Sequence, residues 1–403
     1  MDVKKIRQDF PMLQGSAGNK PVVYLDNACQ TLRPKQVIDA INGYYLKSSA
    51  CGGRSMHHLA AGVSQDVDQA RGIIAKCLNA AKKEEIIFTR NTTEGINLVA
   101  HSLSLKPGDA VLISDKEHNS NLIPWQMLVK RAGVQLKVLP SKPDNTFDLD
   151  RYQSMLDHTV KLVSLGMTSN LDGVSIPAAE VIKKAHQAGA LVLLDAAQAA
   201  PHQAIHVRGL DVDFLALSGH KMLGPSGTGV LYGKLALLDR LEPFLVGGDT
   251  VASSTYETCE FLPVPEKFEA GLQDYAGIIG LGAAFKYLQE VGFDAIQKQE
   301  RLVNQAITQA LKDLPGLTLL GPADPAQRGG VFSFYIEGID SHRIALMLDQ
   351  MAGVMVRSGQ HCVHSWFNAH QIKGSVRASF YFYNTLEEAE LFTSNLKKIR
   401  KVL

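Results

Sequence analysis

Apolar runs of four to seven residues alternate with amphipathic stretches between residues 84 and 234. Helical patterns at residues 95–100, 125–132 and 177–188 separate several of these runs. Strands that are apolar on both faces and separated by helices predict an α/β fold with a mostly parallel seven-stranded sheet covered on both sides. The last two strands are close enough in sequence to pair as a hairpin-like edge. The expected strands are residues 85–89, 110–114, 134–139, 161–167, 190–194, 214–217 and 229–232.

The regular alternation of predicted strands and helices ends at about residue 265. A long helical stretch at residues 278–311 is broken near Gly292. It is followed by strands at 330–335, 354–356 and 376–383, with helices at 341–351 and 385–402. This order predicts a small α+β domain. We therefore expect a large domain of residues 16–265 and a small domain of residues 266–403 that also includes the N-terminal residues 1–15.

Composition and charge narrow the class of protein. Hydrophobic residues make up 45% and charged residues 20% of the 403 residues, which indicates a folded globular chain. The 41 basic and 40 acidic side chains leave a net charge of +1, which argues against nucleic acid as the principal partner. The longest apolar run, residues 276–285, is far below the roughly 20 residues of a membrane-spanning helix.

The termini and the cysteines indicate a cellular compartment. The first ten residues alternate in charge and have no apolar core, so no secretory signal peptide is expected. Five scattered cysteines without a CxxC pair disfavour both a disulfide framework and a structural zinc site. We expect a cytoplasmic enzyme that binds neither membranes nor nucleic acid.

A carboxylate and a lysine stand directly after two of the predicted strands. Asp195 follows strand 190–194, where burying a carboxylate costs free energy unless a cation or a protonated base pairs with it. It either caps the next helix or keeps a cofactor ring nitrogen protonated. Lys221 follows strand 214–217 together with Ser218 and His220, before a glycine-rich turn. A lone lysine is usually a solvated surface charge, but this polar cluster favours a desolvated lysine that condenses with an aldehyde to a Schiff base.

Two threonines, Thr92 and Thr93, open a helix directly after the strand at 85–89. Free amides and hydroxyls at a helix N-terminus bind phosphate. The alternative is a simple threonine N-cap, with Glu94 standing too early to complete a capping box. A phosphate cradle, a carboxylate for a ring nitrogen and a Schiff-base lysine together specify pyridoxal phosphate.

The chain resembles the aminotransferase class V group of fold-type I (aspartate aminotransferase-like) pyridoxal phosphate enzymes. Within that group it is similar to the SufS-like (group II) cysteine desulfurases, and the resemblance covers essentially the whole chain. The motifs that carry it are residues 24–28 (YLDNA), 88–94 (FTRNTTE), 117–121 (EHNSN), 218–221 (SGHK) and 377–384 (RASFYFYN).

The resemblance implies a role for each matching residue. Lys221 would bind the cofactor covalently, Asp195 would pair with its ring nitrogen, and His118 would stack on the ring and assist proton transfer. Gln198 would face the phenolic oxygen, while Thr92 or Thr93, Ser218 and His220 would hold the phosphate. The residues implied to bind the substrate are Arg377, Asn170, Arg357 and His57.

A cysteine near the C-terminus decides which reaction is expected. Residues 356–364 (VRSGQHCVH) resemble the desulfurase arginine–glycine–histidine–cysteine segment. Cys362 lies in a polar loop between two histidines with Arg357 nearby, and cationic neighbours favour the nucleophilic thiolate. Cys77, in a helical context, is expected to be an ordinary buried cysteine. No metal site is expected, because adjacent histidine and cysteine side chains point in different directions and no second ligand pair follows.

Three departures from the family pattern are visible. Leu272 replaces a threonine that in the family supports the phosphate of the partner subunit. Residues 363–366 (VHSW) replace the usual alanine, polar residue and proline after the cysteine, which changes the surface offered to a sulfur acceptor. Asn91 and Cys29 replace residues that are commonly small.

The expected function is therefore pyridoxal phosphate-dependent desulfuration of L-cysteine to L-alanine. The sulfur would remain as a persulfide on Cys362 and pass to an acceptor protein or thiol, for iron–sulfur cluster assembly or another use. The family resemblance implies a homodimer. The alternatives are a selenocysteine lyase, or another class V lyase or aminotransferase in which Cys362 is incidental. A non-catalytic platform with the same fold is disfavoured by the presence of Lys221 and Asp195.

Overall fold

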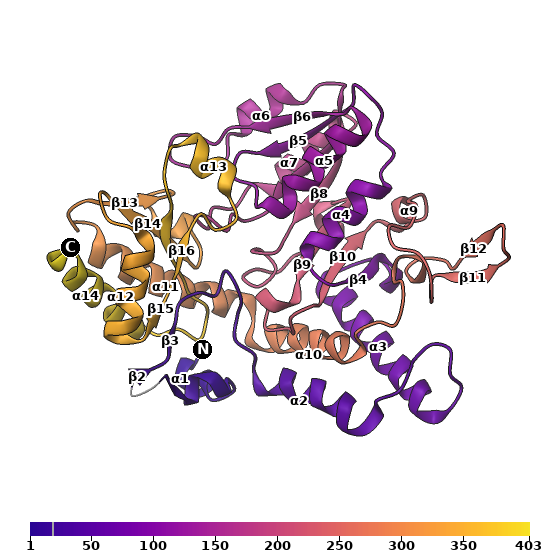
Figure 1. The fold of residues 1–403 in the computed structure, drawn as a ribbon, viewed down its shortest axis with the longest axis horizontal. Helices are drawn as coiled ribbons and strands as arrows, with labels where there is room; N and C mark the ends of the chain where they lie inside the picture. The colour runs from indigo at the N-terminus through magenta and orange to yellow at the C-terminus, as the bar shows by residue number, and fades with distance from the viewer. Residues whose placement is uncertain (18–19) are drawn as a thin grey trace.

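The computed structural model describes residues 1–17 and 20–403, and a seven-stranded sheet lies at its centre (Figure 1). The strand order is β4-β10-β9-β8-β7-β5-β6, and the five strands from β9 to β6 run parallel. The predicted mostly parallel seven-stranded sheet is thereby confirmed. The strands are β4 (Ile86–Thr89), β5 (Ala110–Ser114), β6 (Gln135–Leu139), β7 (Val160–Gly166), β8 (Leu191–Asp195), β9 (Phe214–Ser218) and β10 (Gly229–Gly233).

The hairpin of β9 and β10 forms as expected, but it is not at the edge of the sheet. β10 pairs antiparallel with β9 on one side and with β4 on the other, so β4 is the edge strand. Inserting β10 between β9 and β4 brings the carboxyl end of β4 and the start of the helix after it beside the residues that follow β9. The phosphate-binding candidates at both places are therefore neighbours.

Helices cover both faces of this sheet, which explains why its strands are mostly apolar, apart from the partly exposed edge strand β6. Alternate residues of β4, β5, β8, β9 and β10 enter two different cores. In β8, Val192 and Leu194 belong to the core that includes residues of α3 (His58–Cys77), α7 (Ala178–Gln187) and α10 (Tyr275–Val291). Leu193 belongs to the core that includes residues of α4 (Thr92–Ser102) and α5 (Ile123–Ala132). Burial on both faces keeps water away from the strands.

The C-terminal part of the chain forms a second, four-stranded sheet with the order β13-β14-β17-β16. Three helices, α11, α12 and α14, pack their apolar faces on this sheet, at the left of Figure 1. The long helical stretch is broken at Gly292, whose φ of 85° ends α10 before α11 begins. The elements are β13 (Leu317–Leu320), β14 (Val331–Ile336), β16 (Arg357–Gly359), β17 (Ser375–Ser379), α11 (Phe293–Leu311), α12 (Ser341–Ala352) and α14 (Leu386–Val402).

The strand expected at residues 376–383 is wrong in its second half. β17 ends at Ser379, and residues 380–383 continue as a buried non-strand segment. This segment is apolar because its aromatic side chains pack against Phe10 near the N-terminus. Its apolar pattern thus reflects burial in a core rather than pairing in a sheet.

The N-terminal part of the chain meets the C-terminal part beside the second sheet. β3 (Val23–Tyr24) pairs parallel with β15 (Val354–Met355), and the backbone of Asn27 donates to Ser379 O. α10 packs against α2 and α3 in the first part of the chain. The division into residues 16–265 and residues 1–15 with 266–403 stays a prediction, and these contacts favour assigning β3 to the small domain and α10 to the large one.

The remaining elements are short or lie outside the two main sheets. The β11–β12 hairpin projects at the right of Figure 1. No helix within residues 1–17 and 20–403 is long and apolar enough to cross a bilayer. These elements are α1 (Val3–Arg7), α2 (Lys35–Gly43), α6 (Leu149–Met155), α8 (Val207–Leu210), α9 (Leu235–Leu238), α13 (His364–Ala369), β1 (Ser16–Ala17), β2 (Lys20–Pro21), β11 (Val251–Ser254) and β12 (Cys259–Phe261).

A buried ion pair ties α3 to the segment before α10. Arg71 Nη1 and Nη2 donate to the two carboxylate oxygens of Glu269, each at 2.8 Å, and the Phe88 backbone N–H donates to the same carboxylate. We expect Glu269→Ala to lower the free energy of unfolding by about 3–5 kcal/mol, because it leaves a buried guanidinium unpaired. Urea denaturation measures this change, and Glu266→Ala at an exposed position nearby is the control. An equal effect of the two substitutions would contradict the claim that the buried Arg71–Glu269 ion pair stabilises the fold.

Candidate active site

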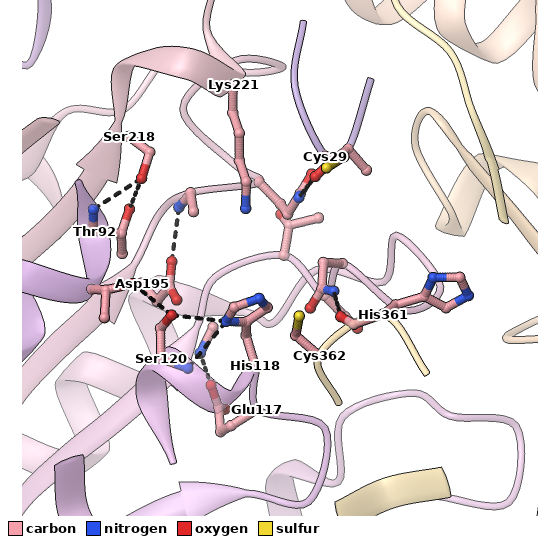
Figure 2. A pocket seen from close by; sticks show the side chains of 18 of the residues that line it. Cys29, Thr92, Glu117, His118, Ser120, Asp195, Ser218, Lys221, His361 and Cys362 are labelled. Atoms are coloured by element: carbon pink, nitrogen blue, oxygen red, sulfur yellow. Dashed lines mark hydrogen bonds between the residues drawn. The ribbon is translucent and has the colours of Figure 1, made fainter. Parts of the chain in front are cut away.

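A cavity of about 230 Å³ lies at the carboxyl ends of the central strands, where the two parts of the chain face each other. Figure 2 shows side chains from both parts pointing into it. Ligands bind at this end of parallel sheets, as the sequence predicted. The predicted site residues that line it are Thr92, Thr93, His118, Asn170, Asp195, Gln198, Ser218, His220, Lys221, Arg357, Cys362 and Arg377.

Lys221 and Asp195 are the two opposite charges at the centre of the site. Burial lowers the pKa of Lys221, and the nearby Asp195 partly offsets this effect. Burial raises the pKa of Asp195, and Lys221 partly offsets that. Asp195 Oδ1 accepts the Ala197 N–H at 2.9 Å, in a turn rather than at the start of a helix. The helix-capping alternative for Asp195 is therefore wrong, and the lysine amine is poised to react with an aldehyde.

A cluster of hydroxyls and amides lies where β9 and the start of α4 meet. The Thr92 backbone N–H donates to Ser218 Oγ at 2.9 Å, and the Thr92 and Ser218 hydroxyl oxygens are 2.7 Å apart. Asn91, rather than a threonine, is the N-cap of α4, since its Oδ1 accepts the Glu94 N–H at 3.0 Å. The threonine N-cap alternative is wrong, and both threonines lie in the first turn, where an anion binds favourably.

Two histidines of the site are held neutral. Burial, followed by the nearby Lys221, lowers the pKa of His118 to about 3 and that of His220 to about 4. His118 Nδ1 accepts the Ser120 backbone N–H at 3.1 Å, so the ring proton resides on Nε2. A neutral imidazole with a fixed tautomer is suited to stacking on an aromatic ring and to moving a proton.

Glu117 is a buried carboxyl of the site to which the motif resemblance gives no role. Its oxygens accept from the Ser114 hydroxyl (2.5 Å), Asn121 Nδ2 (2.7 Å) and the Gly166 N–H (2.9 Å). Burial nevertheless raises its pKa to about 7. Glu117 follows strand β5 closely, so the rule that selected Asp195, a carboxylate just after an apolar strand, could have found it.

Cys362 lies on a turn of unusual backbone conformation. His361 and Cys362 have positive φ values of 49° and 59°. The Asn119 N–H donates to Cys362 O at 2.8 Å, and Asn170 Nδ2 donates to His361 O at 2.7 Å. Both asparagines belong to the first part of the chain, so loops of the large sheet hold the cysteine of the C-terminal part in the shared cavity.

Arg377 and Arg357 bring positive charge to the cavity. Arg377 Nη1 donates to Asn170 O at 2.9 Å, while its buried Nε has no hydrogen-bond partner among the described residues. An unpaired guanidinium N–H fits a carboxylate ligand. Arg357 Nη1 lies 2.7 Å from the sulfur of Cys29, a cavity residue that stands out in the sequence only as a departure from the family.

Of the predicted site residues, His57 lies outside the cavity and Gln198 lines it. His57 does not line the cavity in this single chain, since it is exposed and caps the N-terminus of α3 through the Ala60 N–H. Gln198 does line it, and its Nε2 donates to Ala28 O at 2.7 Å. The groups that line the cavity fit pyridoxal phosphate: an amine for its aldehyde, a buried carboxylate that accepts from its ring nitrogen, and a helix N-terminus with hydroxyls for its phosphate.

The comparisons with known proteins agree with this donor set. The aminotransferase class V family model matches residues 23–392, so the chain belongs to that family. A cysteine desulfurase of Enterobacter sp. (strain 638) is 40% identical over 405 residues that cover 100% of this chain and 99% of the relative. The chain is therefore a member of the cysteine desulfurases within class V.

Two further relatives extend this finding. A cysteine desulfurase of Synechococcus elongatus is 40% identical over 99% of this chain, which spans only 64% of that relative's length. The apo structure of a cysteine desulfurase from Thermococcus onnurineus NA1 has a TM-score of 0.94 and 36% identity, covering 99% of this chain and 98% of the other. The predicted class V cysteine desulfurase family, fold type, enzyme class and pyridoxal phosphate cofactor are confirmed, and the group II subtype stays a prediction.

The raised pKa of Glu117 predicts a pH-dependent contribution to stability. Its carboxyl stabilises the folded state fully below its ordinary pKa of 4.5, and this contribution is lost as the pH rises through about 7. Glu117→Gln cannot titrate, so from about pH 5 to about pH 8 the wild type should lose up to roughly 3 kcal/mol relative to the variant. Urea denaturation across this range is the measurement. Glu180→Gln on the exposed face of α7 is the control, and a constant difference for Glu117→Gln would refute the prediction.

Proposed function

We propose that the protein converts L-cysteine to L-alanine and keeps the sulfur as a persulfide on Cys362. The observation that carries this proposal is that Cys362, Lys221 and Asp195 line one cavity. A class V lyase without a sulfur-carrying step would not need a cysteine there. The relatives named as cysteine desulfurases support the same reaction.

Residues of this chain would hold pyridoxal phosphate at defined points. When bound, the cofactor supplies an electron-withdrawing ring that stabilises negative charge on the substrate next to its amino group. Lys221 would bind its aldehyde, and Asp195 would keep its ring nitrogen protonated. The other residues proposed to hold it are Gln198, His118, Thr92, Thr93, Ser218 and His220.

The substrate would be oriented by its carboxylate. Arg377 offers the unpaired Nε, and Asn170 and Arg357 line the same cavity. The lowered pKa of Lys221 lets its amine take up a proton from the substrate, and His118 Nε2 is a second proton-carrying atom. Both side chains face the cavity in which the reaction takes place (Figure 2).

Cys362 would complete the reaction as a nucleophile. Its thiolate attacks the substrate sulfur, an S–S bond forms, and the C–S bond breaks with its electron pair left on carbon. A proton added to that carbon gives the methyl group of alanine, and the sulfur stays on Cys362 as a persulfide. An acceptor thiol of a protein or a small molecule would then remove it.

The proposal also covers the subtype of the enzyme, its compartment, its sulfur acceptors and its oligomeric state. We infer a group II cysteine desulfurase of the cytoplasm that supplies sulfur for iron–sulfur cluster assembly or other acceptors, and that works as a homodimer. Two observations support the dimer: His57 lies outside the cavity of its own chain, and Leu272 is 68% exposed.

Substitution of Cys362 tests the reaction. With L-cysteine, pyridoxal phosphate and a thiol reductant, the wild type should release alanine and sulfide in equal amounts, and Cys362→Ser should lose at least about 100-fold of this activity because the nucleophile is gone. Cys77→Ser, a change at a cysteine on α3 away from the cavity, is the control and should stay active. Desulfuration that survives in Cys362→Ser would exclude the persulfide mechanism and favour the lyase alternative.

Substitution of Leu272 tests the dimer. A charge placed in a buried interface is costly, so Leu272→Asp should lower the dimer fraction about ten-fold or more. Leu302→Asp, at an exposed position of α11, is the matched control. Light scattering measures the molecular mass, and hence the dimer fraction, of both variants. A wild-type mass of 43.8 kDa in solution, which is that of a single chain, would contradict the dimer directly.

A further inference from the structure

One residue, Asn119, contacts the chain at two points of the turn that carries Cys362. The Asn119 backbone N–H donates to Cys362 O at 2.8 Å, and Asn119 Nδ2 lies 2.9 Å from Nδ1 of His364. Because the amide nitrogen is only a donor, His364 Nδ1 is the acceptor. His364 is the first residue of α13 and is exposed to solvent.

We propose that the Asn119–His364 contact is a latch that keeps the Cys362 turn closed and limits the transfer of sulfur to an acceptor thiol. The inference rests on the proposed function, because it concerns what happens after the persulfide has formed. In that step an acceptor thiolate attacks the outer sulfur of the persulfide, a new S–S bond forms, and the Cys362 thiolate leaves.

The backbone of the turn supplies the reason for a latch. His361 and Cys362 both adopt the left-handed conformation, which is costly for residues with a side chain and persists only where surrounding contacts enforce it. Asn170 Nδ2 donates to His361 O at 2.7 Å, and His361 Nε2 lies 2.8 Å from Ser375 Oγ. Loss of these contacts would let His361 and Cys362 leave the left-handed conformation.

The contacts differ in how easily an acceptor reaches them. Asn170 and His361 are buried, so their contacts fix the sulfur of Cys362 inside the cavity. His364 is exposed, so an acceptor that approaches Cys362 from solvent can displace its contact without disturbing the cavity. Neither Asn119 nor His364 lines the cavity. Loss of the latch should therefore affect sulfur transfer and leave sulfur abstraction unchanged.

The test separates the two half-reactions in the holoenzyme. The substitution Asn119→Ala removes the side-chain contact with His364 but keeps the backbone N–H of residue 119 that donates to Cys362 O. In a single turnover without acceptor, His364→Ala and Asn119→Ala should therefore form one equivalent of alanine and of Cys362 persulfide at the wild-type rate, within about two-fold. On addition of dithiothreitol, both should lose the persulfide several-fold faster than the wild type, as followed by protein mass spectrometry. The double variant should match the single ones, because both remove the same hydrogen bond.

Two further variants guard against a general effect on α13. Asn368→Ala lies at an exposed position of the same helix and should behave as the wild type. His364→Gln supplies an amide oxygen that accepts from Asn119 Nδ2, so it should restore the slow discharge. Equal discharge rates in all variants, or faster discharge in His364→Gln as well, would overturn the latch. Absence of persulfide in the wild type would overturn the proposed function instead, together with the latch that depends on it.

Discussion

The site depends on burying a lysine and a carboxylate together at the end of a sheet that is covered on both faces. Lys221 and Asp195 each lose hydration, and each is the main charge that offsets the other's loss. The compensation is incomplete, so the pKa of the amine is lowered and that of the carboxyl is raised. A lysine that gives up its proton readily is a consequence of the packing around the sheet, not of the lysine alone.

Other ionisable groups surround the Lys221–Asp195 pair. Glu117 adds a second buried carboxyl, which accepts from the Gly166 N–H, and Gly166 is the register partner of Asp195 on the neighbouring strand. Arg377 supplies positive charge from the second sheet. Because burial keeps His118 neutral, it adds no further positive charge beside Lys221 at neutral pH. The cavity is therefore lined by more basic than acidic side chains, with Lys116, Lys221, Arg357 and Arg377 against Glu117 and Asp195.

Much of the fold follows from local patterns, since strands buried on both faces are apolar throughout and helices between them are amphipathic. The position of β10 could not be predicted, because its second partner β4 lies far away in sequence. Residues 380–383 mimic a strand because packing against Phe10 requires the same apolar side chains. The cavity residues were found through motifs, and the rule that selected Asp195 applies to Glu117 as well, whereas the contacts of Asn119 with the Cys362 turn join distant parts of the chain that no local pattern connects.

The reactive cysteine shows how the two parts of the chain depend on each other. Lys221 and Asp195 are placed by strands of one sheet, and the turn of Cys362 is held at the same cavity by the Asn119 backbone N–H and the Asn170 side chain, which lie in loops of that sheet. The positive φ of Cys362 gives this arrangement a stored conformational cost. In the proposed function Cys362 receives sulfur in the cavity and delivers it to an acceptor outside, and such a conformation suits both steps because few contacts hold the turn and one of them, at His364, faces solvent.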